Sequence, residues 1–128
     1  MGIAQQKAGQ ASEIAFAKFM KSNGRWVYRC PNNFGQPADF IIAYKDKFWL
    51  ADSKHCDRDR FSTDRIEDNQ RTAMDYFQSK TDGKAYFVID YKDDFYILFW
   101  DLISARRGSV KVTEFAIPIE QALKDGLI

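Results

Sequence analysis

The chain of 128 residues has few of the side chains that build disulfide scaffolds or zinc sites. Its two cysteines, Cys30 and Cys56, form neither a CxxC pair nor a disulfide framework, and a single histidine, His55, does not support a zinc site. His55 is interpreted instead as a solvated loop residue or a phosphate contact. No apolar run approaches the ~20 residues of a membrane span, and the first residues lack the apolar core of a secretory signal. We therefore expect a reduced, cytoplasmic protein that does not associate with membranes.

Internal repeats, low-complexity tracts and linkers are also missing, so we expect one domain over residues 1–128. The chain is instead rich in apolar residues, with 45% hydrophobic and 16% aromatic residues, which argues against disorder. The aromatic residues lie mostly in expected strands, so core packing explains them better than base stacking. The net charge of +1 gives no overall signature of nucleic-acid binding. If several acids bind metal, the remaining surface is more basic than this number suggests.

Apolar periodicity predicts the order α-β-β-β-α-β-β, followed by a small tail. The expected helices cover residues 7–23 and 63–79, and Asp64 with Glu67 has the spacing of a capping box. The expected strands cover residues 25–30, 39–44, 47–54, 84–90 and 94–100. Residues 55–64 are polar without periodicity and are predicted to form a surface loop. The tail is predicted to contain a helical turn, a weak strand and a short helix, at residues 101–107, 110–116 and 118–124. The fold class is α/β, with a mixed central sheet flanked by helices.

Residues 35–54 read as two strands joined by a tight turn. If Lys45 and Asp46 form the turn, each residue before it faces the residue equally far behind it, so Asp39 faces Asp52. Their Cβ atoms would then be about 4.5–5.5 Å apart, and alternation places Lys54 on the same face as Asp52. Opposed carboxylates repel each other unless a positive group lies between them; the candidates are a divalent cation and Lys54. A slip of one residue would put the two carboxylates on opposite faces.

Each expected helix carries one polar residue on its apolar face, Glu13 on the first and Gln70 on the second. The apolar positions that share these faces are Gly9, Phe16, Ala17 and Met20, and Ile66, Ala73, Met74 and Phe77. The ordinary explanations are a Glu13 at the edge of the stripe, bonded to Lys or Arg, and a core Gln70 bonded to backbone. An exposed hairpin face would likewise explain Asp39, Asp52 and Lys54. Brought together, the five residues supply hard oxygen ligands for Mg²⁺ or Mn²⁺ with a lysine beside them, which suits phosphodiester hydrolysis.

This pattern resembles the PD-(D/E)xK nuclease superfamily, with Pro-Ala-Asp at residues 37–39 and Asp-Ser-Lys at residues 52–54. Within it, the chain is most similar to Holliday-junction resolvases of the archaeal type and of the RecU type. The similarity covers roughly residues 7–100. It is carried by Gly9 and Glu13, the approach at residues 35–39, the hairpin, Asn69-Gln70 and the FVIDY strand. Asp52 stands where these resolvases usually have Glu, and the junction-inserting stalk of RecU proteins is absent.

The resemblance implies a restriction-endonuclease-like fold and a metal-dependent DNA endonuclease that acts on branched DNA as a homodimer. It implies that Mg²⁺, or Mn²⁺ in its place, is bound by Glu13, Asp39, Asp52 and the backbone carbonyl of Ser53. Lys54 would be the catalytic lysine, and Gln70 would position the lysine, the water or the substrate strand. The alternatives are a nuclease of this fold that acts on other DNA structures or on a restriction-type site, and a catalytically silent DNA-binding protein.

Basic residues near these positions are candidate contacts for DNA phosphates. They are Arg58, Arg60 and Arg65 in the loop after Lys54, with Lys18 and Arg29 near the first helix. The three loop arginines alternate with Asp57, Asp59 and Asp64, so a locally paired, solvated loop explains them equally well.

Overall fold

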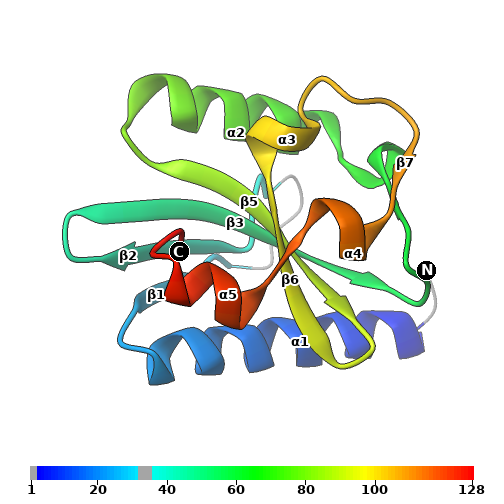
Figure 1. Ribbon diagram of the computed structural model, residues 1–128, viewed down its shortest axis with the longest axis horizontal. Helices are drawn as coiled ribbons and strands as arrows, with labels where there is room; N and C mark the ends of the chain where they lie inside the picture. The colour runs from blue at the N-terminus through cyan, green and yellow to red at the C-terminus, as the bar shows by residue number, and fades with distance from the viewer. Residues whose placement is uncertain (1–2, 32–35) are drawn as a thin grey trace.

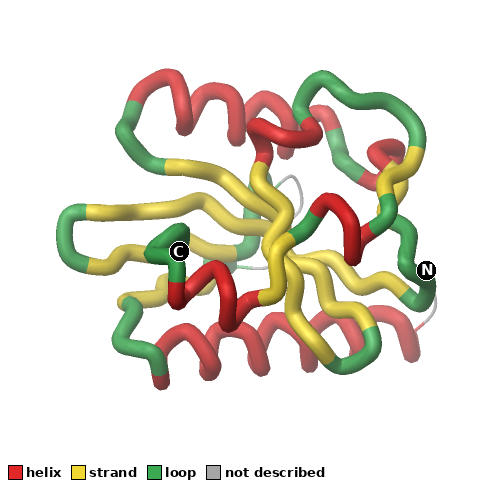
Figure 2. The backbone as a smooth tube through the Cα atoms, in the orientation of Figure 1, coloured by secondary structure: helices red, strands yellow, loops and turns green. Residues whose placement is uncertain are grey.

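The computed structural model describes residues 3–31 and 36–128, with the backbone alone described for residues 3–8. A six-stranded sheet lies between α1 and α2 (Figures 1 and 2). The helices are α1 Ile3–Ser22, α2 Asp68–Lys80, α3 Trp100–Ile103, α4 Val112–Phe115 and α5 Ile119–Lys124, with a 3₁₀ turn, η1, at Thr63–Arg65. The strands are β1 Trp26–Arg29, β2 Phe40–Tyr44, β3 Lys47–Cys56, β4 Phe61–Ser62, β5 Lys84–Tyr91, β6 Asp94–Phe99, β7 Ser109–Val110 and β8 Ile117–Pro118.

The strand order in the main sheet is β1-β2-β3-β5-β6-β8. All neighbours are antiparallel except β3 and β5, which are parallel and joined through α2. A parallel pair needs such a crossover because its strands run in the same direction. Residues 85–89 of β5 are all buried, as expected for a central strand that is covered on both faces. The mixed sheet flanked by helices confirms the predicted fold class.

Two hydrophobic cores cover the two faces of the sheet. The core on the α1 side includes Phe16 and Met20 of α1, with residues 119 and 122 of α5. The core on the α2 side includes Met74 of α2 and Trp100 of α3. Side chains alternate along β3, so Trp49 and Ala51 enter the first core, while Leu50 and Cys56 pack in the second. Asp52 and Lys54 therefore lie on the α2 face, with Gln70.

The second helix starts later than the sequence predicts, at Asp68 rather than at residue 63. Residues 63–65 form η1 instead, and the Ser62 hydroxyl accepts a hydrogen bond from the Asp64 N–H. The capping pair of α2 is Glu67 with Gln70, so the predicted pairing of Asp64 with Glu67 is wrong. The first helix also starts earlier than predicted, at Ile3.

The segment after Lys54 is not the surface loop that its polarity predicts. β3 continues through His55 to Cys56, and Phe61 is fully buried in the small sheet of β4 and β7. Single apolar residues fill this part of the α2-side core, and their wide spacing among charged residues gives no periodicity. The prediction of a weak strand over residues 110–116 is also wrong, because β7 ends at residue 110 and α4 follows.

The remaining elements follow the predictions closely. β1, β5 and β6 lie where expected, α3 provides the helical turn, and α5 covers residues 119–124. Both cysteines are free. None of the helices in residues 3–31 and 36–128 has the length and apolar character needed to cross a membrane.

Gly83 lies in the tightly packed connection between α2 and β5. A Cβ atom at this position would lie 2.6 Å from the rings of Phe48 and Phe77. We expect Gly83→Ala to lower the free energy of unfolding by about 1–3 kcal/mol, because the two half-buried rings must shift. Gly9→Ala is the control: nothing lies within 4 Å of its added Cβ, so in a helix it should be neutral or stabilising by up to about 1 kcal/mol. Urea unfolding would measure both, and an unaffected Gly83→Ala would contradict the packing.

Candidate active site

The hairpin of β2 and β3 has the predicted register. Tyr44 pairs with Lys47 and Phe40 with Ala51, so the turn is centred on Lys45 and Asp46. Lys45 has a φ of 56°, as expected for a tight turn between two strands. Asp39 lies one residue before the ladder, and its N–H donates to the Ala51 carbonyl at 3.1 Å. Of the approach at residues 35–39, Gly35 lies outside the described residues.

Asp52, Lys54 and Gln70 contact one another at the end of β3. Lys54 Nζ lies 3.1 Å from Asp52 Oδ2 and donates to Gln70 Oε1 at 3.3 Å. Gln70 Nε2 donates to Asp52 Oδ2 at 3.0 Å, which closes the triangle. Asp52 is only 3% exposed and Gln70 6%. The carboxylate is therefore shielded from water and depends on these two partners.

Gln70 also caps its own helix. Its Oε1 accepts the Glu67 N–H at 3.1 Å, in addition to the Lys54 ammonium. The first N–H groups of a helix have no partner within the helix, so this bond satisfies one of them. The explanation of a core Gln70 bonded to backbone is confirmed, and the same side chain also contacts Asp52 and Lys54; its functional role stays a prediction.

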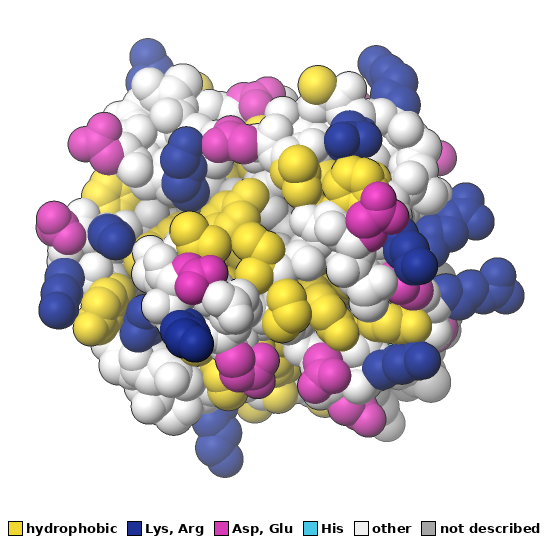
Figure 3. All heavy atoms as spheres, viewed as in Figure 1, with side chains coloured by type: hydrophobic (Ala, Val, Ile, Leu, Met, Phe, Trp, Pro, Cys, Tyr) yellow, Lys and Arg dark blue, Asp and Glu magenta, His cyan; other side chains and the backbone are white. Residues whose placement is uncertain are grey.

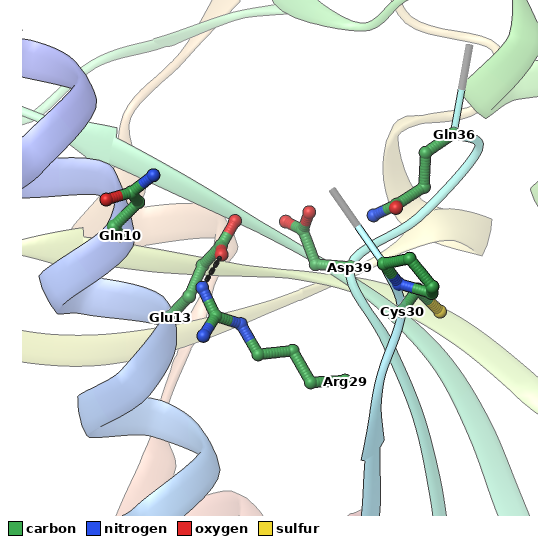
Figure 4. Close-up of a pocket in the computed structure, with 7 residues that line it drawn as sticks. Gln10, Glu13, Arg29, Cys30, Gln36 and Asp39 are labelled. Carbon is green, nitrogen blue, oxygen red and sulfur yellow. Dashed lines mark hydrogen bonds and ion pairs between the residues drawn. The ribbon is translucent and has the colours of Figure 1, made fainter. Parts of the chain in front are cut away.

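Glu13 and Asp39 face each other across a pocket between α1 and the β1 end of the sheet (Figure 4). The pocket has a volume of about 260 Å³ and is lined by Gln10, Glu13, Arg29, Cys30, Pro31, Gln36 and Asp39. Glu13 Oε2 forms an ion pair with Arg29 at 2.7 Å, which is the ordinary pairing that the sequence allowed. Asp39 Oδ2 accepts the Ser53 N–H at 2.8 Å, so Asp39 bonds directly to the segment of the Asp-Ser-Lys motif.

The three carboxyl groups all have raised pKa values. Burial raises the pKa of Asp39 to about 7, and the neighbouring Asp52 charge adds to the rise. Burial also raises the pKa of Asp52, against the Lys54 ammonium, and that of Glu13, against its bond to Arg29. Crowded acids with too little positive charge around them favour the protonated form. Added positive charge near these three carboxyl groups would therefore lower their pKa values.

The donor atoms at the site fit a hard divalent cation. Carboxylates and carbonyl oxygens are the ligands that Mg²⁺ and Mn²⁺ prefer. Gln36 Oε1 lines the same pocket, is buried and has no hydrogen-bond partner among the described residues. Within residues 3–31 and 36–128, no three His, Cys, Asp or Glu side chains are yet close enough to hold a metal ion. In this arrangement Arg29 holds Glu13, which keeps one of the expected ligands paired.

The expected phosphate contacts differ in how they are engaged. Lys18 and Arg58 are exposed, whereas Arg29 pairs with Glu13. Arg60 donates to the Ser109 hydroxyl at 2.7 Å, and Arg65 donates to the His55 carbonyl at 2.8 Å. The face in Figure 3 mixes acidic and basic side chains without a large patch of one sign. Among the described residues, Lys18 and Arg58 are therefore the two candidates whose side chains have no hydrogen bond or ion pair that would compete with a phosphate.

The local pairing suggested for the loop arginines is not what the aspartates do. Asp57 lies 2.9 Å from His55 Nε2, and Asp59 accepts the Thr113 N–H at 2.9 Å. The two acids tie the end of β3 and the start of α4, respectively. The Asp57 contact is local, whereas the Asp59 contact joins residues distant in sequence, which the alternation of charges cannot reveal.

Sequence reasoning missed a second polar cluster behind the site. The Ser12 hydroxyl donates to Asp90 Oδ2 at 2.8 Å, and His55 Nδ1 lies 3.5 Å from the same oxygen. The hydrogen bond with Asp57 is the main reason why the pKa of His55 is raised. Ser12 precedes Glu13 on α1, so this cluster fixes α1 to β5 and β3. Its only sequence signal is an aspartate inside the apolar FVIDY strand. Gln10 and Gln36 were missed as well.

No protein-family model matches the sequence, and neither does any curated protein. Solved structures do match its fold, among them the 1.6 Å structure of Hjc from Archaeoglobus fulgidus, a Holliday junction resolvase from an archaeal hyperthermophile. The match has a TM-score of 0.70 and 10% sequence identity, and it covers 89% of this chain and 98% of that one. At this identity the match concerns the fold, and it confirms the predicted core and the resemblance at that level.

The raised pKa of Asp39 makes stability depend on pH. Because the folded-state pKa of about 7 lies above the ordinary value of 3.8, this group's stabilising contribution is complete below pH 4 and is lost as the pH rises through 7. With divalent ions removed by chelator, we expect Asp39→Asn to melt at a higher temperature than the wild type at pH 8 and near it at pH 5. Asp46→Asn, at the exposed turn, is the control. Parallel pH profiles of Asp39→Asn and the wild type would contradict the assignment.

Gln70 is expected to matter for folding as well as for chemistry. Gln70→Ala removes the partner of a buried carboxylate and of the Glu67 N–H, so the free energy of unfolding should fall by about 1–3 kcal/mol. Thr72→Ala, on the exposed side of α2, should change it little. Urea unfolding followed by circular dichroism measures both variants, and equal stabilities would show that the Gln70 bonds do not support the site.

Proposed function

We propose that the protein is a metal-dependent DNA endonuclease that hydrolyses phosphodiester bonds in branched DNA. The observation that carries the proposal is the contact of Asp52, Lys54 and Gln70 directly beside the Glu13–Asp39 pocket. A lysine held against a buried carboxylate, next to two further crowded acids, is costly for the fold. A purely structural role gives no reason for the arrangement, which favours an enzyme over a catalytically silent DNA-binding protein.

Asp39, Asp52 and the backbone carbonyl of Ser53 would hold Mg²⁺, or Mn²⁺ in its place, and Glu13 would bind it directly or through water. A bound ion of this kind polarises a phosphoryl oxygen and lowers the pKa of a bound water. Its positive charge would also relieve the crowding that raises the pKa values of these acids.

Lys54 would orient the attacking water and stabilise the negative charge that develops on the phosphate. Its ammonium group contacts Asp52 and Gln70, both within 3.3 Å, and these contacts would hold it in position for this role. Because Gln70 is anchored at the start of α2, the position of the lysine is set by the helix rather than by a mobile chain. Gln70 is a positioning residue in this scheme.

The choice of branched DNA is supported by the fold, which is shared with a Holliday junction resolvase. We propose a homodimer, because two symmetric sites are needed to cut two strands of a junction in a paired manner. A nuclease of the same fold that cuts duplex ends, nicks or a restriction-type site is the second candidate. The segment between α1 and Asp39 is short and holds no junction-inserting stalk of the RecU type, which favours this second candidate.

The test is cleavage of a synthetic four-way junction, a fork and a linear duplex, with Mg²⁺ and separately with Mn²⁺. We expect paired cuts in the junction, and we expect Asp52→Asn to slow cleavage more than about 100-fold while DNA binding is kept or strengthened. Asp46→Asn is the matched control and should cut at the wild-type rate.

Two results would contradict the proposal. A folded protein that cuts none of the three DNAs with either ion is not a nuclease of this kind. An Asp52→Asn variant that cuts near the wild-type rate would show that the site is wrongly assigned. Cleavage of duplex or fork in preference to the junction would favour the second candidate.

A further inference from the structure

Two aromatic side chains stand exposed on the edge strand β1. Trp26 is 59% exposed and Tyr28 is 45% exposed. Their rings are nearly parallel, at 11°, with centroids 6.3 Å apart. The expectation that aromatic residues serve core packing is therefore wrong for these two. Together with the exposed Ile41 of β2, which pairs with Tyr28, they form a surface that we call the aromatic ledge.

Two rows of side chains cross the sheet, and the aromatic ledge is the end of these rows that α2 does not cover. Residues paired across neighbouring strands point to the same face. The rows are Tyr28–Ile41–Leu50 and Trp26–Ala43–Phe48. At their β3 ends, Leu50 packs in the α2-side core and Phe48 meets Phe77 of α2 at 6.1 Å. α2 thus covers β3 and leaves the same face open over β1 and β2.

The ledge continues directly into the candidate active site. Cys30, the next residue after Tyr28 with the same orientation, donates its N–H to the Asp39 carbonyl at 2.8 Å and lines the pocket. Asp52 likewise follows Leu50 on the α2 face. At about 3.3 Å per residue, Tyr28 lies roughly 7 Å and Trp26 roughly 13 Å along the strand from Cys30. The aromatic rings and the half-buried Asp39 therefore lie on the same face of the sheet, with Cys30 between them.

We propose that the aromatic ledge binds unpaired nucleobases of the DNA strand that enters the site. Exposed aromatic rings on a sheet are the usual platform for stacking single-stranded bases, which works for any base because each has a π-face. Bases inside a duplex are already stacked and do not reach such a ledge. The substrate class follows: DNA with unpaired bases beside the cleaved phosphate. This inference rests on the proposed function.

A second copy of the chain is the other occupant to consider. A folded partner seated on the ledge would lie one row of side chains from Asp39 and Asp52 and would obstruct the substrate strand. A single strand of DNA uses both surfaces at once, since its phosphate meets the carboxylate site while its bases lie on the rings. The shared face therefore favours DNA.

Tryptophan fluorescence tests the ledge independently of cleavage. Of the three tryptophans, Trp49 and Trp100 are only 3% and 2% exposed, so Trp26 is the one that bases can quench. The Asp52→Asn protein, in chelator, is titrated with a thymidine oligonucleotide and with a duplex of equal length. We expect quenching by the single strand and little by the duplex.

Fluorescence anisotropy of labelled DNA then gives the affinities of the ledge variants. Trp26→Ala combined with Tyr28→Ala should weaken binding of the single strand about tenfold or more, while Trp26→Phe, which keeps an aromatic ring, should stay near the parent. Leu102→Ala, an exposed apolar residue of α3, is the control and should change nothing.

Unchanged single-strand affinity in the double variant would overturn the proposal, and so would equal quenching by duplex. If the double variant instead turns a dimer into a monomer in sedimentation, with single-strand affinity per chain unchanged, the ledge is a self-association surface and the proposal fails. A protein that cleaves DNA, but whose Trp26 fluorescence the single strand does not quench, would refute this inference alone. Ledge binding without any cleavage would support the inference and refute the proposed function.

Discussion

The burial of the Asp52 carboxylate is the constraint on which the rest of the site depends. A charge taken out of water costs several kcal/mol unless close partners compensate for it. Lys54 and Gln70 provide those partners, at 3.1 and 3.0 Å. Even so, burial raises the pKa of Asp52 above its ordinary range, so the compensation is incomplete. A positive charge that bound beside these acids would therefore stabilise the protein.

The same constraint explains where α2 begins. The sequence offers two capping pairs, and Asp64 with Glu67 has the more familiar spacing to an apolar run. The structure uses Glu67 with Gln70, and the same Gln70 side chain that caps this start also contacts Asp52 and Lys54. A tertiary contact thus decides between two local signals of similar strength. The helix start and the site are consequently one feature, and sequence periodicity alone cannot separate the two possible starts.

The sequence predicts best what is set by neighbours along the chain. The turn at Lys45 and Asp46 and the pairing of β2 with β3 follow from local alternation, and the opposition of Asp39 and Asp52 follows from that pairing. The Ser12–Asp90 bond and the pairing of β4 with β7 join residues more than 45 positions apart, and no local pattern marks them. Likewise, Trp26 and Tyr28 read as core residues because the sequence does not say which strand lies at the sheet edge.

The position of β1 at the edge of the sheet links the aromatic ledge to the pocket at Asp39. β1 and β2 extend beyond the cover of α2, so one face of the sheet stays open next to the buried Asp52. In the proposed function, the opening that exposes Trp26 and Tyr28 would also be the route of a phosphate to Asp39, because Cys30 joins the ledge to the pocket. An additional helix over β1 would bury the rings and strengthen the core, but it would also close the approach. Exposed aromatic rings at this edge are thus consistent with a face that is kept free for a ligand.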